Sequence, residues 1–479
     1  MKQIADHIFS IKMMIYVFLV ITMLETTSSI YTLIGNVNSI IITWALLCAI
    51  YKIVKERKIY KDLKSVLVYI FLLSFLISIV INRDINFMAN LKILMLVVIY
   101  LFVFFLDCES SNREEAEKSI HICNTILIYM SLILSFAGLI TFFFWFEFSI
   151  FSYPQGFHSP SLWGFYKNPN TGGMIAVISI IATIIDFNFL KGKSKKSFRL
   201  YKKIIYISNI VIQSLFILQS GSRGSLLSII IVVFVLFFDR FAYFYKKILP
   251  LKRIFFRTAF AIALAILTSF AAITGIYYTG QGIKHVTALV PPRVRGALID
   301  AGYGVLYEDE FNIGAGGKGA QFTVDREIEA GNISTGRFTI WMSGLKALKF
   351  RPVFGFGPNN IDVAKMMANP DDMKSGYVTT GNMHNGFLQI LLSSGILGFV
   401  IFSVLYSMLI FRLINAYLKN RTDSKRRWGI LLISSMILAI TVIGIVENII
   451  LIIMAVAPLI LWVYLGYTSS LISDHYIKE

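Results

Sequence analysis

The chain has 479 residues, of which 56% are hydrophobic and only 15% are charged. This apolar share exceeds that of ordinary soluble domains and excludes a soluble globular protein. The formal net charge is +18, and the basic residues are concentrated beside apolar segments, as expected where a protein meets anionic lipid headgroups. The charge therefore indicates contact with membrane lipids and requires no nucleic-acid partner.

Apolar runs of membrane-spanning length recur along the whole chain. A spanning helix needs about 20 mostly apolar residues, and the pattern predicts about 12 of them. The runs lie near residues 10–30, 34–53, 65–82, 91–106, 120–146, 171–190, 203–219, 225–239, 258–277, 386–411, 429–447 and 449–467. The predicted fold class is an all-α polytopic membrane protein.

The basic residues also predict the orientation. Lys and Arg near helix ends are retained on the cytoplasmic side, and most of the 45 Lys and Arg lie in alternate connections and the termini. Both termini are then cytoplasmic. The expected division is residues 1–277 with helices 1–9, residues 278–384 as one long extracytoplasmic helical loop domain between helices 9 and 10, and residues 385–479 with helices 10–12 and a cytoplasmic C-terminus.

The long loop is predicted to contain a helix of its own. Loops of this length are usually functional, and "TGRFTIWMSGLKALKF" begins a helix at Arg337 with Phe338, Trp341, Leu345 and Leu348 on one face. The Pro and Gly residues of "RPVFGFGPNN" end it. No carboxylate cluster in the loop has the pattern of a Mg²⁺ site, so neither a metal nor a cofactor is implied.

Cysteine placement predicts no disulfide. Cys48 and Cys123 fall in predicted helices and Cys108 in a predicted cytoplasmic connection.

Three polar stretches lie at helix ends on the same predicted outer side: "GFYKNPNTGG", "QSGSRGSLLS" and "NMHNGFLQILLSSGILG". Each has a structural alternative. Arg223 can extend to lipid headgroups, the glycines can serve helix packing, and His384 can simply begin a helix. Their convergence on one side favours a functional site.

These stretches resemble the O-antigen ligase and O-antigen polymerase superfamily. In that family an Arg-containing motif opens a helix after a short outer turn, and here Arg223 in "SRGSLL" fits it. The family's long outer loop ends in His and Asn, Ser or Gln, followed after nine residues by Gly-x-x-Gly, and His384, Asn385, Gly395 and Gly398 fit this pattern. The "FYKNPN" stretch resembles another outer loop of the family. The resemblance implies a metal-independent glycosyltransferase that acts on undecaprenyl-diphosphate-linked sugars at the outer leaflet.

The chemistry of glycan transfer agrees with these residue types. A departing lipid diphosphate needs fixed cations, and the guanidinium fork matches phosphate oxygens. Arg223 is the first candidate, Arg337 the second, and Arg293 and Arg295 are weaker ones. His384 is expected either to take the acceptor's proton or to bind the diphosphate.

Other residues are weaker candidates for the site. Substrate contacts are expected from Asn385, Lys167, Asn168 and Asn170. Glu447, in the turn between the last two helices, has a solvated carboxylate as its simplest interpretation. A buried Glu25 requires a partner.

The predicted function is polymerisation of lipid-linked polysaccharide repeat units in the bacterial cytoplasmic membrane, with the site facing outward. The expected partners are an undecaprenyl-diphosphate-linked oligosaccharide donor, a glycan acceptor and a chain-length regulator protein. Ligation to lipid A-core is the alternative within the family. A transporter is the alternative of another class, but the distinctive residues lie at helix ends and the two halves do not match.

Overall fold

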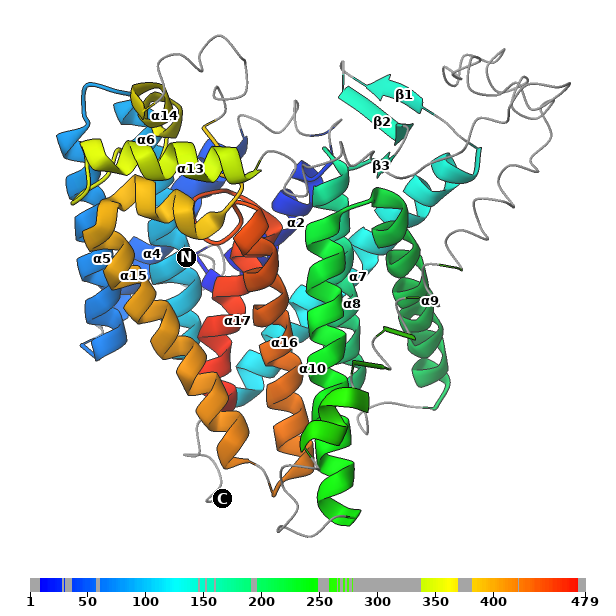
Figure 1. Cartoon of the computed structure of the whole chain (residues 1–479). Coiled ribbons are helices and arrows are strands. Elements are labelled where there is room, and N and C mark those ends of the chain that lie inside the picture. The colour runs from blue at the N-terminus through cyan, green and yellow to red at the C-terminus, as the bar shows by residue number, and fades with distance from the viewer. Residues whose placement is uncertain are drawn as a thin grey trace, which may run out of the picture. The chain divides into compact units, whose positions relative to one another are not determined.

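The computed structural model describes most of the membrane-embedded chain (Figure 1). The described residues are 9–27, 30, 37–56, 61–144, 147–150, 153–158, 161–190, 196–248, 337–368, 381–420 and 422–472, with parts of 258–278. Arg293 and Arg295 lie outside them, as do parts of the predicted ninth span.

The described residues form long apolar helices, and this confirms the all-α polytopic membrane fold. Nine helical stretches in the described part of the chain are long and apolar enough to cross a membrane. The helices are α2 (Ile11–Glu25), α4 (Val37–Glu56), α5 (Leu63–Ile81), α6 (Phe87–Val98), η1 (Ile99–Asp107), α7 (Arg113–Phe144), α8 (Pro169–Leu190), α9 (Lys196–Ser220), α10 (Arg223–Ile248), α13 (Arg337–Ala347), η4 (Leu348–Phe350), α14 (Ile361–Ala368), α15 (Gly386–Lys419), α16 (Ser424–Val446) and α17 (Val456–Ile472).

The chain folds into two compact units. The first comprises residues 1–23, 35–126 and 330–479, and the second comprises 24–34 and 127–329. These are units of packing, whereas the division expected from the sequence follows membrane topology, which stays a prediction.

In the first unit, α15 packs along α5, and α17 packs against η1 and α16. Trp462 of α17 is fully buried, with ring centroids 5.8 Å from Phe105, 6.3 Å from Phe402 and 6.4 Å from Tyr406. Aromatic contacts at such separations add to the burial of apolar area. This aromatic cluster joins three helices into one packed body.

The long helix α15 is interrupted at Gly395, where φ is 69° and ψ is −174°. The loop 352–357 supplies partners for the backbone groups released by the break. The four bonds are Phe356 N to Leu392 O (2.9 Å), Gly357 N to Ser393 O (3.0 Å), Ile396 N to Pro352 O (2.8 Å) and Leu397 N to Val353 O (3.2 Å). Because unpaired peptide groups are costly inside a membrane, this loop is what allows the helix to break.

Only glycine fits at the crossing of the two segments. A Cβ on Gly395 would lie 2.2 Å from Val353 O, and one on Gly355 would lie 2.4 Å from Leu392 O. Both residues also have positive φ, which side chains disfavour. The glycines of "RPVFGFGP" and "SSGILG" are thus two halves of one backbone junction.

Helix α13 lies across the N-terminal end of α15 (Figure 1), and its formation confirms the helix predicted in the loop. The apolar face expected from the sequence is buried only in part: Trp341 and Leu348 pack against a buried cluster, whereas Phe338 is 61% and Leu345 is 40% exposed. The buried side contains small residues, and a Cβ on Gly344 would lie 2.4 Å from Met383 Cε. Close approach through glycine therefore decided which side packs.

The last apolar run also differs from its prediction. Residues 449–455 are irregular, and α17 begins only at Val456. Trp462 Nε1 donates to Ile450 O at 2.9 Å, and Tyr100 Oη donates to Ile453 O at 2.9 Å. Side chains of neighbouring helices thus supply the partners that a helix would supply itself.

The second unit contains α8 packed between α9 and α10. It also holds a small antiparallel sheet, in the order β1 (Glu147–Ile150), β2 (Tyr153–His158) and β3 (Ser161–Gly164). The aromatic residues of this stretch gave no sign of a sheet. An isolated bridge between Thr27 and Tyr166 follows β3 and leads the chain into α8.

Candidate functional site

Glu447 brings together two of the predicted site residues. Arg337 Nη2 lies 2.8 Å from Glu447 Oε1, and His384 Nδ1 lies 3.2 Å from Glu447 Oε2. The three side chains are 20%, 34% and 18% exposed for Arg337, His384 and Glu447. They form a part-buried cluster that solvent and a ligand can still reach.

Each member of the cluster stands at the end of a different helix. Arg337 begins α13, His384 directly precedes the N-cap of α15, and Glu447 is the C-cap of α16. Asn385 forms that N-cap, and its side-chain oxygen accepts from the amides of residues 387 and 388, both at 3.0 Å. Gly386 N also donates to Glu447 O at 3.1 Å, which ties the start of α15 to the end of α16.

His384 has a backbone conformation that is rare for a residue with a side chain. Its φ is +46°, in the left-handed region, where such strain persists only if the surroundings enforce it.

Four hydrogen bonds enforce that conformation by holding residues 381–384. They run from His384 N to Asn382 Oδ1 (2.9 Å), from Met383 N to Gln389 Oε1 (2.9 Å), from Trp341 Nε1 to Met383 O (3.0 Å) and from Gln389 Nε2 to Gly381 O (3.1 Å). The turn therefore aims the imidazole at one position.

Lys365 of α14 supports the same turn. Its side chain is buried, and Nζ donates to Asn382 O at 3.2 Å. Burial lowers the pKa of Lys365 to about 8, against the opposing effect of the Asp362 carboxylate. The amine is therefore a polar anchor whose charge is costly to maintain.

The geometry around His384 has a clear protonation consequence. A carboxylate only accepts hydrogen bonds, so the contact with Glu447 needs the imidazole proton on Nδ1. In the neutral ring this leaves Nε2 as an acceptor with a free lone pair. The arrangement suits a base that is oriented by a carboxylate, whose own charge is offset by Arg337.

The second unit holds the other predicted polar stretches. Arg223 begins α10 and its side chain is exposed. The preceding turn has Gly221 at φ +64°. A Cβ on Gly173 of α8 would lie 2.8 Å from Ser222 Cβ and from Ser225 Oγ. The structure thus packs "NPNTGG" directly against "SGSRGS", as two parts of one surface.

Lys167 lies at the start of that surface. Its backbone N donates to Thr26 O at 2.8 Å, and burial lowers the pKa of its side chain to about 8, against the opposing charge of Glu25. Glu25 is itself buried, so the carboxylate that needed a partner has a lysine nearby. Asn168 caps α8, since its Oδ1 accepts from Thr171 N at 2.8 Å, and Asn170 is half-buried.

The predicted site residues thus fall into two groups. His384, Asn385 and Arg337 belong to the first unit, and the remaining described ones belong to the second. The caps formed by Asn385 and Asn168 give both residues a structural role, and their contact with substrate stays a prediction.

Sequence reasoning underrated Glu447 and missed Gln389 and Lys365. A signal for Glu447 was present, because it is the lone carboxylate in the apolar stretch "IGIVENIILII" and lies on the same predicted side as His384. Nothing in the sequence indicated that Gln389 and Lys365 hold the His384 turn.

Comparison with known proteins agrees with the motifs. Residues 209–403 match the family model described as O-antigen ligase. The match spans less than half of the chain and includes Arg223, Arg337 and His384, whereas Glu447 and "FYKNPN" lie outside it. No curated protein sequence matches the chain.

Proposed function

We propose that this polytopic membrane protein, whose residues 209–403 match the O-antigen ligase family model, polymerises lipid-linked polysaccharide repeat units. The donor is a glycan on undecaprenyl diphosphate, and the acceptor is a sugar hydroxyl of another lipid-linked unit. The site faces outward from the bacterial cytoplasmic membrane, which is the side that the basic connections predict for residues 278–384.

The contact of His384 with Glu447 is the observation that carries this proposal. In the transfer, the acceptor oxygen forms a bond to the anomeric carbon of the donor, and the bond from that carbon to the diphosphate oxygen breaks. The acceptor proton passes to His384 Nε2, the nitrogen that Glu447 leaves free. Glu447 holds the ring and stabilises the imidazolium that results.

The departing lipid diphosphate takes up the bonding electrons and needs a cation. We assign this role to Arg223, whose exposed side chain opens an apolar helix. Arg337 is less suited to it, because Glu447 already offsets its charge. Arg337 then acts by positioning Glu447.

Polymerisation is preferred to ligation because the superfamily serves many polysaccharide pathways, of which only one ends on lipid A. Purified protein supplied with the lipid-diphosphate oligosaccharide alone separates the two activities. Products of several repeat units support a polymerase, whereas transfer that requires added lipid A-core identifies a ligase. Translocation of the donor without a new glycosidic bond would overturn the enzyme assignment.

The same assay tests the residues. His384→Ala is expected to lower turnover by about 10² to 10⁴-fold. Arg223→Lys keeps the charge but loses the paired hydrogen bonds, and we expect a decrease of about 10 to 150-fold. Unchanged turnover in Arg223→Lys, with normal insertion and thermal stability, would mean that Arg223 only contacts lipid headgroups and does not bind the diphosphate.

A further inference from the structure

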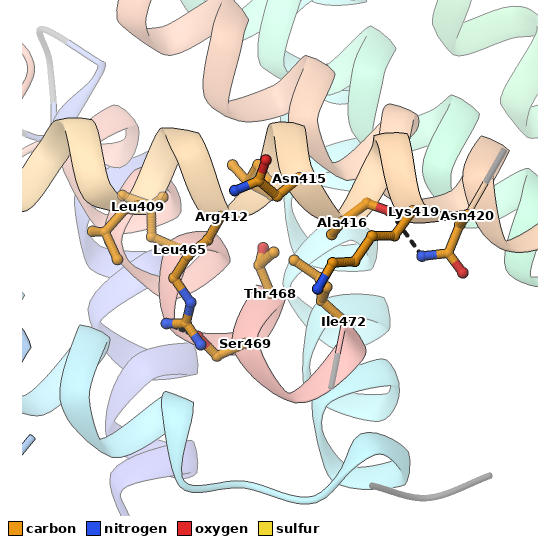
Figure 2. A pocket seen from close by; sticks show the side chains of 11 residues that line it. Leu409, Arg412, Asn415, Ala416, Lys419, Asn420, Leu465, Thr468, Ser469 and Ile472 are labelled. Atoms are coloured by element: carbon orange, nitrogen blue, oxygen red, sulfur yellow. Dashed lines mark hydrogen bonds between the residues drawn. The ribbon is translucent and has the colours of Figure 1, made fainter. Parts of the chain in front are cut away.

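A cavity of about 310 Å³ lies between the C-terminal halves of α15 and α17, at the opposite end of α15 from His384. Its lining divides into two kinds of side chain. Arg412, Lys419 and Ser469 are polar, and Leu413, Leu465 and Ile472 are apolar. Figure 2 shows the Arg412 and Lys419 side chains extending from α15 toward α17 on the same side.

The charge of this cavity is not compensated by its own lining. Among the residues that the structure describes, two cations and no carboxylate line it. Arg412 Nη1 is 2.9 Å from Glu109 Oε1 and 3.2 Å from Ser469 Oγ, but the same Glu109 oxygen also pairs with Lys64. The Lys419 side chain is exposed. The Ser469 hydroxyl donates to Glu109 Oε1 at 2.7 Å. An anion entering the cavity therefore meets positive charge from α15.

A second cavity in the same unit shows the opposite arrangement. It is lined by lysines together with carboxylates, and these form ion pairs within it, Lys12 with Glu115 and Lys52 with Asp107. Basic side chains alone thus do not distinguish the cavity at α15 and α17. The difference is that none of the described residues lining the cavity at α15 and α17 is a carboxylate.

The surface beside the cavity is apolar. Phe411, Ile414 and Leu418 of α15 are 63%, 46% and 39% exposed, and their spacing places them along one side of the helix. In a membrane-spanning helix such a stripe faces acyl chains. Polar cavity and apolar stripe together match the two chemical parts of a phospholipid.

We propose that the cavity between α15 and α17 binds the phosphate of an anionic phospholipid, with the acyl chains along the 411–418 stripe of α15. Arg412 and Lys419 contact the phosphate. The basic residues between 419 and 428 predict the cytoplasmic side, so the lipid belongs to the inner leaflet. The alternative is that the cations only neutralise the carbonyl ends of α15 and α17.

The test is binding of fluorescent phosphatidylglycerol to the purified full-length chain in neutral detergent, with phosphatidylcholine of the same acyl chains as the reference lipid. We expect at least about tenfold tighter binding of phosphatidylglycerol to the wild type. Lys419→Gln should remove most of that preference. Lys425→Gln deletes a charge in the same connection, outside the cavity, and should leave it unchanged.

Two further arms complete the test. Inorganic phosphate at millimolar concentration should compete weakly, because it lacks the acyl chains, and full displacement would identify a free-phosphate site instead. Equal preference in Lys419→Gln and Lys425→Gln would overturn the proposal in favour of helix-end neutralisation. Arg412→Gln also breaks the contact with Glu109, so the exposed Lys419 is the decisive position. None of these readouts depends on glycan transfer.

Discussion

The two ends of α15 hold cations in different ways. At its N-terminal end, Arg337 and His384 both contact Glu447, and the positive φ of His384 fixes the imidazole. At its C-terminal end, Arg412 and Lys419 line a cavity whose other described lining residues are uncharged. In the proposals made above, the first end orients a base for glycan transfer and the second binds a lipid phosphate.

A carboxylate bridges basic groups at both ends, yet the partners differ. Glu447 contacts an arginine and a histidine, whereas Glu109 contacts Lys64, Arg412 and Ser469. Among the partners of these two carboxylates, only the imidazole has a ring nitrogen that can accept a proton from a substrate. The comparison therefore predicts that the Glu447 end carries the proton transfer and that the Glu109 end serves attachment.

A substitution in the backbone junction near the His384 end of α15 should cause the largest change, a loss of stability. Gly395→Ala forces a Cβ to 2.2 Å from Val353 O at a positive φ, and we expect a loss of stability of about 4 kcal/mol or more. Gly429→Ala in α16 is the matched control, because nothing lies within 4 Å of a Cβ there. Thermal unfolding in detergent measures both. Equal unfolding temperatures would mean that the junction yields easily and does not position the site.

The two carboxylates provide the next comparison. Glu447→Gln should lower kcat by about 10 to 100-fold with little change in KM, because the imidazole loses the partner that holds its proton on Nδ1. Glu109→Gln removes the same charge at the other end of α15 and should leave kcat unchanged. A fall of equal size in both variants would indicate a general loss of folding and would contradict the positioning role of Glu447.

The smallest effect concerns the pH dependence of stability. The pKa of Lys365 is about 8 in the folded chain and 10.5 in the reference state, so the unfolded chain binds more protons between these values. Stability should therefore rise as the pH increases from about 8 to 10.5.

Lys365→Met should reduce this rise by about 2 °C or more in unfolding temperature. Some of the rise should remain, because burial lowers the pKa of Lys167 in the same direction. The exposed Lys349 is the control, and Lys349→Met should keep the full rise. An unchanged profile in Lys365→Met would show that its amine is not buried in the folded protein.

Much of the helical framework could be predicted from the sequence. The run at 65–82 is observed as Leu63–Ile81 and the run at 171–190 as Pro169–Leu190, because about 20 consecutive apolar residues are enough to specify a span. The start of α15 was equally predictable, because Asn385 precedes an apolar run as an N-cap should.

The candidate site was only partly predictable. His384 and Arg337 were found through their motifs, but Glu447 comes from a connection 63 residues beyond His384, and no local pattern links them. The buried side of α13 was predicted only in part, for a related reason. Periodicity identifies a helix, whereas the side that packs depended on how closely Gly344 approaches Met383.

The sequence by itself determined where the chain enters the membrane, because transfer of an apolar segment into lipid depends on its own composition. Only the tertiary structure decided which apolar segments do not form a regular helix. Residues 449–455 are as apolar as the helices around them, yet they are irregular, because Tyr100 and Trp462 bind their carbonyls. Likewise α15 breaks at Gly395 because the loop 352–357 takes up its released backbone groups. A helix satisfies its peptide groups from its own residues, whereas a break needs partners that other segments of the chain must supply.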